Sequence, residues 1–152
     1  MKRLFDLVLS IWGILVLLPV FIIIAILIKL DSDGDIIFKQ IRVTKDGKKF
    51  KIFKFRTMKS DTEKQGQITI GADNRITVIG KFLRKTKLDE MPQLLNIVMG
   101  DMSFVGPRPE VPKYVDLYTD EQKEILKVRA GITDYASIYF SDESEILGKQ
   151  KN

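Results

Sequence analysis

The sequence contains neither cysteine nor histidine. Without cysteine the chain can form no disulfide and has no thiolate nucleophile, and a reducing compartment is permitted. Without histidine it has no Ser-His-Asp or Cys-His triad and no histidine-ligated zinc. Aspartate, glutamate, lysine, serine, threonine and tyrosine remain for chemistry, so we expect any enzyme built from this chain to work with carboxylates.

The chain is short and basic. Its 152 residues are enough for one domain with a buried core. The formal net charge of +5 favours anionic partners, which include phosphorylated substrates, the acidic face of a membrane and nucleic acid. Nucleic acid is the weakest of the three, because no recognisable nucleic-acid motif is present and the aromatic residues fall in predicted strands.

A hydrophobic block occupies the N-terminal part of the chain. No residue from Leu7 to Ile28 carries a formal charge, and a straight helix of that length, rising about 1.5 Å per residue, would cross about 30 Å of hydrocarbon. Pro19 lies inside the block and predicts a kink or break, because proline removes a backbone hydrogen bond and costs about 3 kcal/mol in a helix interior. Each piece on its own is too short to span. Two paths remain open: a kinked spanning helix, or a re-entrant helix that enters and leaves by one face.

The charges that flank this block favour the re-entrant path. Lys2 and Arg3 precede it and a Lys/Arg-rich region follows it, so the positive-inside tendency draws both ends toward the cytoplasm. A cleaved signal peptide is disfavoured, because the apolar region is too long and residues Lys29 to Asp33 offer no small-residue cleavage site.

The remaining sequence predicts short strands and amphipathic helices. β-rich runs over Ile36–Val43 and Lys49–Met58 flank the turn signal Lys45–Lys48, which predicts a β-hairpin. In the second run basic residues alternate with aromatic ones, as in an amphipathic strand with solvated lysines or in a row that faces phosphate. Residues Lys59–Asn74 are predicted to form a loop. Ile76–Thr86 has a helical spacing with one apolar and one basic side, which fits a helix on an anionic membrane surface or one packed on the core.

These patterns predict an α+β chain in two parts. Residues 1–30 form a Pro-kinked re-entrant membrane helix. Residues 31–152 form a small cytoplasmic domain with a β-hairpin and surface amphipathic helices.

Two adjacent acids are the candidate catalytic residues. Asp89 and Glu90 are expected in the first turn of a helix that Thr86 or a neighbour caps and Gly100 ends. Carboxylates favour the positive end of a helix dipole, so helix capping alone can explain them. The same dipole is expected to keep Asp89 ionised, and an anion beside cations can hold a divalent ion or attack phosphorus. The expected buried stripe of this helix is Leu88, Met91, Leu95 and Val98, and the expected outward polar face is Asp89, Gln93 and Asn96.

A proline-rich turn follows at Gly106-Pro107-Arg108-Pro109. Two prolines restrict the backbone around one guanidinium group, which presents a fixed fork suited to phosphate. A rigid surface turn without a ligand is the alternative interpretation.

Six features occur in order along the chain. They are the Lys-Arg-x-x-Asp start (Lys2, Arg3, Asp6), the proline-broken hydrophobic helix, Phe53–Met58, Leu88–Leu94, Gly100–Pro109 and Val128–Thr133. The set covers nearly the whole chain and resembles the bacterial sugar transferases, also called small monotopic phosphoglycosyl transferases. Members of that family usually continue past the position of Asn152 with further surface helices, so a minimal member and a shortened chain both remain open.

The resemblance implies an enzyme that moves a phosphosugar from a UDP-sugar to polyprenol (undecaprenyl) phosphate and releases UMP, the first membrane step of bacterial glycan assembly. By analogy, Asp89 is the nucleophile that forms an aspartyl-phosphosugar intermediate. Glu90 would assist by proton transfer or, with Asp89, by holding Mg²⁺. Substrate contacts would come from Lys54, Arg56, Arg84, Arg108, Arg129, Thr133 and Asp134.

The implied location is the cytoplasmic face of the bacterial inner membrane, with membrane lipid as a partner and no nucleic acid. Neither the sugar, the polyprenol nor the oligomeric state follows from the sequence, and a dimer is one option. The alternative from another class is a membrane-anchored module without catalysis, whose basic face binds acidic lipid or a protein partner.

Overall fold

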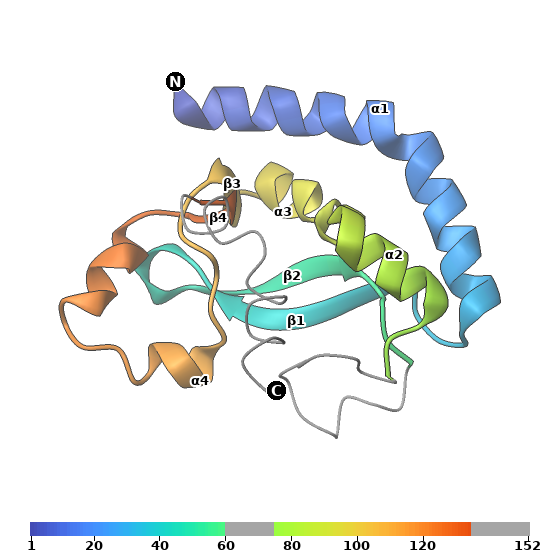
Figure 1. Ribbon diagram of the computed structural model, residues 1–152. Helices are drawn as coiled ribbons and strands as arrows, with labels where there is room; N and C mark the ends of the chain where they lie inside the picture. The colour runs from blue at the N-terminus through green and yellow to red at the C-terminus, as the bar shows by residue number, and fades with distance from the viewer. Residues whose placement is uncertain (60–74, 135–152) are drawn as a thin grey trace.

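The computed structural model describes residues 1–59 and 75–134 (Figure 1). Along the chain the elements, with η for a 3-10 helix, are α1 (Lys2–Asp31), β1 (Ile37–Val43), η1 (Lys45–Gly47), β2 (Lys49–Phe55), α2 (Val78–Thr86), η3 (Leu88–Glu90), α3 (Gln93–Met99), β3 (Met102–Val105), α4 (Pro112–Val115), η4 (Gln122–Lys127) and β4 (Ala130–Thr133). This mixture of helices and short strands confirms the predicted α+β class. Beyond Lys59, the predicted loop lies outside the described residues.

The first helix, α1, is long, apolar and bent. Pro19 lies within it, and Figure 1 shows the helix crossing above α3 and then turning down beside α2. A bend is what a proline inside a helix predicts. The most apolar 18-residue window has a mean hydropathy of 3.2, and only 11% of that window is buried. The helix therefore exposes an apolar surface suited to a membrane rather than to water.

Polar side chains attach both ends of α1 to the rest of the protein. Near the start, a carboxylate oxygen of Asp6 accepts a hydrogen bond from the Ser103 hydroxyl at 2.8 Å. Arg3 donates to two backbone carbonyls at the end of α3, at 2.5 and 3.0 Å. At the other end, Asp31 accepts from the backbone N–H of Ile79 at 2.9 Å. The Lys-Arg-x-x-Asp start thus has a structural role, because it docks α1 on the rest of the protein.

The predicted hairpin is confirmed. β1 pairs with β2 in antiparallel register, with Ile37 opposite Phe55 and Val43 opposite Lys49. In the connecting turn, Asp46 and Gly47 have φ values of 58° and 74°. Glycine and aspartate are among the residues that adopt this left-handed conformation most readily, which explains why the turn signal was reliable.

A second sheet consists of β3 and β4, which pair in parallel. Just beyond β3, Gly106 lies against Gly131 of β4. A Cβ atom added to Gly131 would lie 2.2 Å from the backbone nitrogen of Gly106, so any side chain there would force the two backbones apart. This parallel pair was not predicted, because its strands are short and far apart in the sequence.

The amphipathic helix predicted over Ile76–Thr86 is confirmed as α2. Thr77 caps it by accepting from the backbone N–H of Gly80 at 3.0 Å. Leu83 is buried against the core, whereas Val78 and Phe82 point away from it and are exposed. Packing on the core is thus confirmed for one side of α2, and contact of the other side with a membrane stays a prediction.

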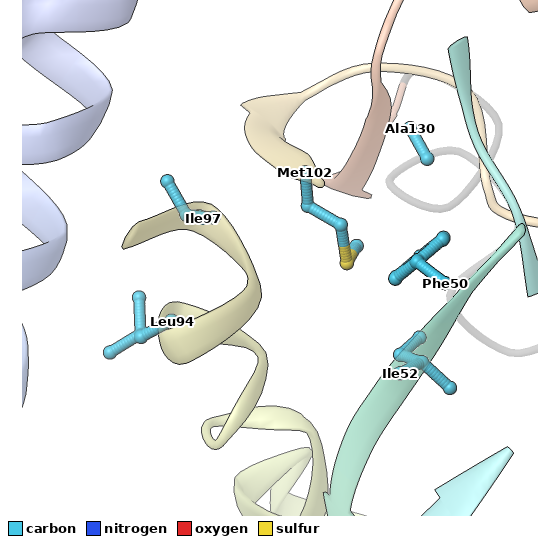
Figure 2. Close-up of a cluster of buried hydrophobic side chains, with 6 residues drawn as sticks. All are labelled: Phe50, Ile52, Leu94, Ile97, Met102 and Ala130. Carbon is cyan, nitrogen blue, oxygen red and sulfur yellow. The ribbon is translucent and has the colours of Figure 1, made fainter. Parts of the chain in front are cut away.

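The core joins α3 to both sheets. Figure 2 shows its buried side chains, which come from β2, α3, β3 and β4: Phe50, Ile52, Leu94, Ile97, Met102 and Ala130. Because these residues come from distant parts of the chain, their burial fixes α3 relative to the hairpin. The acidic pair precedes α3 directly, so the core also positions that pair.

The orientation of α3 differs from the prediction. Leu95, expected in the buried stripe, is 44% exposed, whereas Leu94 and Ile97 are 5% and 0% exposed. The face expected to be outward and polar is the one that packs inward. The amide of Asn96 accepts from the backbone N–H of Phe53 at 3.0 Å and donates to the carbonyl of Lys51 at 2.8 Å. An amide that bonds to a strand edge can be buried at little cost, which the hydrophobic pattern does not reveal.

Candidate active site

The acidic pair lies in the short 3-10 helix η3, between α2 and α3. Asp89 and Glu90 are in the first turn of η3, and α3 begins only at Gln93, so the expectation that they fill the first turn of the helix ended by Gly100 is wrong. Lys87, with a left-handed φ of 58°, caps the C-terminal end of α2. The Thr86 hydroxyl donates to the carbonyl of Phe82 within α2 and does not cap the acids. The predicted end at Gly100 is confirmed, with a left-handed φ of 91°.

Glu90 is held by two cations. Its Oε1 lies 2.7 Å from Nζ of Lys54 and 3.2 Å from a guanidinium nitrogen of Arg108. Burial alone would raise the pKa of Glu90, but the charge and hydrogen bond of Lys54, with the charges of Arg108 and Lys87, outweigh it and lower the pKa. Glu90 is therefore the readily ionised member of the pair.

Asp89 has a different environment, although it is the adjacent residue. Its side chain is buried, with only 8% of the residue exposed. Burial raises its pKa, and the neighbouring charge of Glu90 adds to this, while Lys54 and Arg84 oppose it. Within the residues that the structure describes, Oδ1 of Asp89 has no hydrogen-bond partner. The expectation that Asp89 points away from the core is therefore wrong, because its side chain is buried. That Asp89 is ionised stays a prediction.

A pocket opens beside Glu90. Three cations, one carboxylate, one amide and a small apolar patch form its wall: Arg42, Lys54, Arg108, Glu90, Gln93, Ile52, Ile132, Pro109 and Gly131. Asp89 lies next to this wall in the chain but does not form part of it. Clustered cations beside a carboxylate can bind a phosphate group and neutralise charge that develops on it.

The proline-rich turn is docked on β4. The backbone N–H of Gly131 donates to the carbonyl of Pro107 at 2.9 Å, and the N–H of Gly106 donates to the carbonyl of Thr133 at 3.1 Å. These bonds hold the turn so that Arg108 reaches Glu90. The rigid turn that the prolines predict is thus present, and it brings its guanidinium to the acidic pair.

Two polar side chains of the pocket wall were not identified as site residues from the sequence. Arg42 belongs to β1 and donates to the carbonyl of Pro109 at 3.0 Å, a contact across the fold. A single basic residue in a strand gives no signal of such a contact. Gln93 was noted only for its helical spacing from Asp89, and that spacing was the available signal.

Comparison with known proteins decides the family. A sequence model described as "Bacterial sugar transferase" matches residues 1–151. The chain belongs to this family. Membership confirms the expectation of a transferase enzyme and removes the alternative of a module without catalysis.

Several curated relatives resemble this transferase over most of its length. An exopolysaccharide production protein of Rhizobium leguminosarum is 48% identical over 71% of this chain and 55% of its own length. The UDP-glucose:undecaprenyl-phosphate glucose-1-phosphate transferase of Escherichia coli is 41% identical over 99% of this chain and 34% of its own. A UDP-N-acetylgalactosamine-undecaprenyl-phosphate N-acetylgalactosaminephosphotransferase of Aeromonas hydrophila is 39% identical over 90% of this chain and 33% of its own. The chain thus spans about one third of the latter two relatives.

Two of the arginines predicted to bind substrate in this transferase contact the backbone. The guanidinium of Arg56 donates to the carbonyls of Ser32 and Asp33, at 2.6 and 2.7 Å, where α1 joins β1. Arg129 donates to the carbonyl of Gly100 at 3.0 Å, at the far end of α3 from the acidic pair. The structure therefore does not bring these two side chains to the pocket, and their contact with substrate stays a prediction.

The other predicted site residues are nearer to the acids. Lys54 and Arg108 contact Glu90, and the charge of Arg84 acts on Asp89 while its guanidinium donates to the Thr57 hydroxyl at 2.9 Å. Thr133 contributes its carbonyl to the docked turn, and Asp134 follows β4 directly. Direct substrate contacts of Thr133 and Asp134 stay predictions.

The acidic pair fits one mode of magnesium binding. Among the residues described, no three Asp or Glu side chains gather in one place. Mg²⁺ commonly binds through one or two carboxylates together with substrate phosphates, so a complete protein cage is not needed. The unpartnered Oδ1 of Asp89 provides a suitable oxygen ligand next to Glu90. Magnesium binding by these two residues stays a prediction.

Proposed function

We propose that this transferase moves a sugar 1-phosphate from a UDP-sugar to undecaprenyl phosphate and releases UMP. The proposal rests on one observation: two adjacent carboxylates, with their pKa values displaced in opposite directions, lie among Lys54, Arg84 and Arg108 beside a cationic pocket. The names of the Escherichia coli and Aeromonas hydrophila relatives give the donor and acceptor class for those proteins. The exposed apolar surface of α1 supports a lipid-linked acceptor.

The proposed reaction proceeds in two displacements at phosphorus. A carboxylate oxygen of Asp89 attacks the phosphorus that carries the sugar, the bond from that phosphorus to the bridging oxygen breaks, and UMP leaves with the bond's electrons. A phosphate oxygen of undecaprenyl phosphate then attacks the same phosphorus and displaces the Asp89 carboxylate. Because Asp89 is the nucleophile in the first displacement and the leaving group in the second, one pocket can serve two unlike substrates in turn.

The neighbouring residues have distinct proposed roles. Lys54, Arg84 and Arg108 stabilise the negative charge on the phosphoryl oxygens as the bonds rearrange. Lys54 and Arg84 also lower the pKa of Asp89 against the effect of burial, and so favour the nucleophilic anion. Glu90, with Asp89, would hold Mg²⁺, which supplies positive charge beside the diphosphate when bound.

A re-entrant path of α1 belongs to the same proposal. Contacts at both ends of the helix support it: the start of α1 bonds to β3 and α3, and its end bonds to α2. A straight helix of 30 residues would separate its ends by about 45 Å, whereas the bent helix has both ends on one small domain. We propose that this domain lies on the cytoplasmic face of the bacterial inner membrane. The acidic pair would then lie near the headgroups, where the acceptor phosphate is found.

Trapping of the intermediate tests the proposed function. The purified protein is incubated with Mg²⁺ and a panel of UDP-sugars in the absence of acceptor, quenched in acid and digested for mass spectrometry. The expected result is a sugar-phosphate adduct on Asp89 together with one equivalent of UMP. Asp89→Asn should abolish both products.

The control is Asp116→Asn, which makes the same chemical change at an exposed aspartate outside the pocket. This variant should form the adduct normally. UMP release by Asp89→Asn at the normal rate, or an adduct on another residue, would overturn the assignment of the nucleophile.

A further inference from the structure

Arg42 is held in the wall of the cationic pocket by neutral groups. Its Nε and Nη2 both donate to the side-chain oxygen of Gln40, at 3.0 and 2.7 Å, and its Nη1 donates to the carbonyl of Pro109 at 3.0 Å. A carboxylate in the position of that amide would cancel the charge of the guanidinium group. The amide oxygen of Gln40 therefore fixes the orientation of Arg42 and leaves its charge intact.

The other two cations of the pocket wall differ from Arg42. Lys54 and Arg108 both contact Oε1 of Glu90. Arg42 instead lies 3.9 Å from the carboxylate of Glu110, which is too long for a hydrogen bond, and the Glu110 side chain is 38% exposed to water. Burial lowers the pKa of Arg42, and the charge of Arg108 adds to this, while Glu110 opposes it. Arg42 thus carries a charge that the protein neutralises only weakly, and an anion in the pocket would stabilise it.

The register of the hairpin places Arg42 farther from the acidic pair than Lys54. Lys54 of β2 pairs with Phe38 of β1. Arg42 follows Phe38 by four residues, so it lies on the same face of the hairpin, about 14 Å farther along at about 3.4 Å per residue. Lys54 contacts Glu90, whereas Arg42 reaches the same pocket from this more distant position. The two cations are therefore placed for different parts of an extended anion.

We propose that Arg42 binds the phosphate group that leaves as part of UMP, and that Gln40 positions Arg42 for this contact without cancelling its charge. The inference rests on the proposed function, because it assumes that Asp89 attacks the phosphorus that carries the sugar. That phosphorus then lies beside Lys54 and Glu90, and the second phosphate of the donor extends along the hairpin toward Arg42. A fixed cation there stabilises the charge that UMP gains when the bond to the bridging oxygen breaks.

Gln40→Glu tests the inference, because it keeps the contact and cancels the charge. A glutamate carboxylate can accept both bonds from Arg42, so the variant should unfold at the wild-type Tm or above it. The affinity for UMP is measured by isothermal titration calorimetry of the full chain in detergent with Mg²⁺. It should fall about tenfold, the size expected for the loss of one charged contact. Uridine, which lacks the phosphate, should show no such difference between variant and wild type.

Two further variants and a matched control separate charge from orientation. Glu110→Gln removes the exposed carboxylate near Arg42 and should tighten UMP binding, by about twofold to threefold. Gln40→Met removes the acceptor without adding charge and should weaken UMP binding, because Arg42 is no longer oriented. Gln122→Glu adds the same negative charge at an exposed glutamine outside the pocket and should leave the affinity for UMP unchanged.

A purely structural role of the contact between Gln40 and Arg42 predicts a different result. Gln40→Glu would then bind UMP as the wild type does, because the contact is kept, and this outcome would overturn the inference. Unchanged UMP affinity in Gln40→Met, or a wild type that does not bind UMP, would overturn it as well. A higher KM for undecaprenyl phosphate with unchanged UMP affinity would assign Arg42 to the acceptor phosphate and refute the inference. If Gln40→Glu does not fold, Glu110→Gln and Gln40→Met still test it.

UMP binding is measured without turnover, so failure of this inference can be told apart from failure of the proposed function. If Asp89→Asn still releases UMP from a UDP-sugar at the normal rate, the proposed function fails, whatever the affinity of the Gln40 variants. If Asp89→Asn is inactive and Gln40→Glu binds UMP as the wild type does, only the role of Arg42 is refuted.

Discussion

Asp89 and Glu90 are adjacent in the chain, yet their surroundings give them opposite properties. Burial raises the pKa of Asp89, whereas Lys54 and Arg108 lower the pKa of Glu90 despite its burial. Two carboxylates whose pKa values are displaced in opposite directions are suited to separate tasks. Glu90 is suited to hold a cation or to balance charge, and Asp89 carries a desolvated carboxylate whose anion is costly and reactive.

The raised pKa of Asp89 predicts a stability difference that depends on pH. The folded state binds the Asp89 proton more tightly than the unfolded state, so stability falls as the pH rises from the ordinary value of 3.8 through the raised pKa. Asp89→Asn mimics the neutral form and should escape this loss. Near pH 8 we expect the Tm of Asp89→Asn to exceed that of the wild type, by about 2–4 °C for each kcal/mol of folding stability regained. This difference in Tm should disappear toward pH 4.

Differential scanning fluorimetry of the detergent-solubilised protein across this pH range measures the effect. The exposed Asp116→Asn variant should follow the wild type at every pH. A Tm of Asp89→Asn below wild type at pH 8 would show that the ionised carboxylate stabilises the fold, and so would contradict the raised pKa.

At the scale of elements, α3 connects the acidic pair to the sheet. One edge of β2 pairs with β1, and its other edge bonds to the amide of Asn96 through Lys51 and Phe53. Lys54 follows directly in the strand and pairs with Glu90. The amide of Asn96 therefore sets the register between the strand that supplies the cation and the helix that follows the carboxylates.

Asn96→Leu is predicted to disturb both stability and activity. The substitution leaves a backbone N–H and a carbonyl of β2 unpaired in a part-buried position, where each group costs about 1 kcal/mol, the lower end of the range for buried groups. We expect the Tm to fall by at least about 4 °C. UMP release should also fall, because the ion pair between Lys54 and Glu90 is weakened when α3 is no longer fixed to β2. Leu95→Ala, a change at the exposed neighbour on α3, is the control and should lower the Tm far less. An Asn96→Leu variant as stable as wild type would mean that the amide does not fix α3.

At the scale of the whole molecule, the membrane helix is attached to the catalytic domain at both ends. Arg3 and Asp6 bond to α3 and β3, and Asp31 bonds to the backbone of α2. The bend at Pro19 allows these attachments to exist together. Attachment at both ends predicts that the N-terminus and the domain share one side of the membrane.

The absence of native cysteine makes this topology simple to test. One cysteine is placed in an N-terminal tag, and in a separate variant Lys113→Cys marks the exposed surface of the domain. With a membrane-impermeant maleimide, both cysteines should be protected in intact cells and labelled after permeabilisation. Labelling of the tag alone in intact cells would establish a spanning helix and contradict the re-entrant path.

Features encoded by neighbouring residues followed from the sequence alone. The uncharged run with Pro19 predicted a bent membrane helix, the Lys45–Lys48 signal predicted the hairpin, and the periodicity of Ile76–Thr86 predicted α2. Each depends on hydrophobic spacing, turn chemistry or the missing N–H of proline, which act within a few residues. The acidic pair was identified as catalytic because it lies in a set of motifs whose order resembles that of the bacterial sugar transferases.

Features that depend on distant contacts were decided only by the tertiary structure. Asn96 turns inward because the free edge of β2 lies within reach, and Asp89 is buried because η3 packs against α2 and β2. Arg42 and Gln93 enter the pocket, whereas Arg129 bonds to the end of α3. A side chain's environment depends on which segments of the chain pack against it. The spacing of charges and apolar residues along one segment does not contain that information.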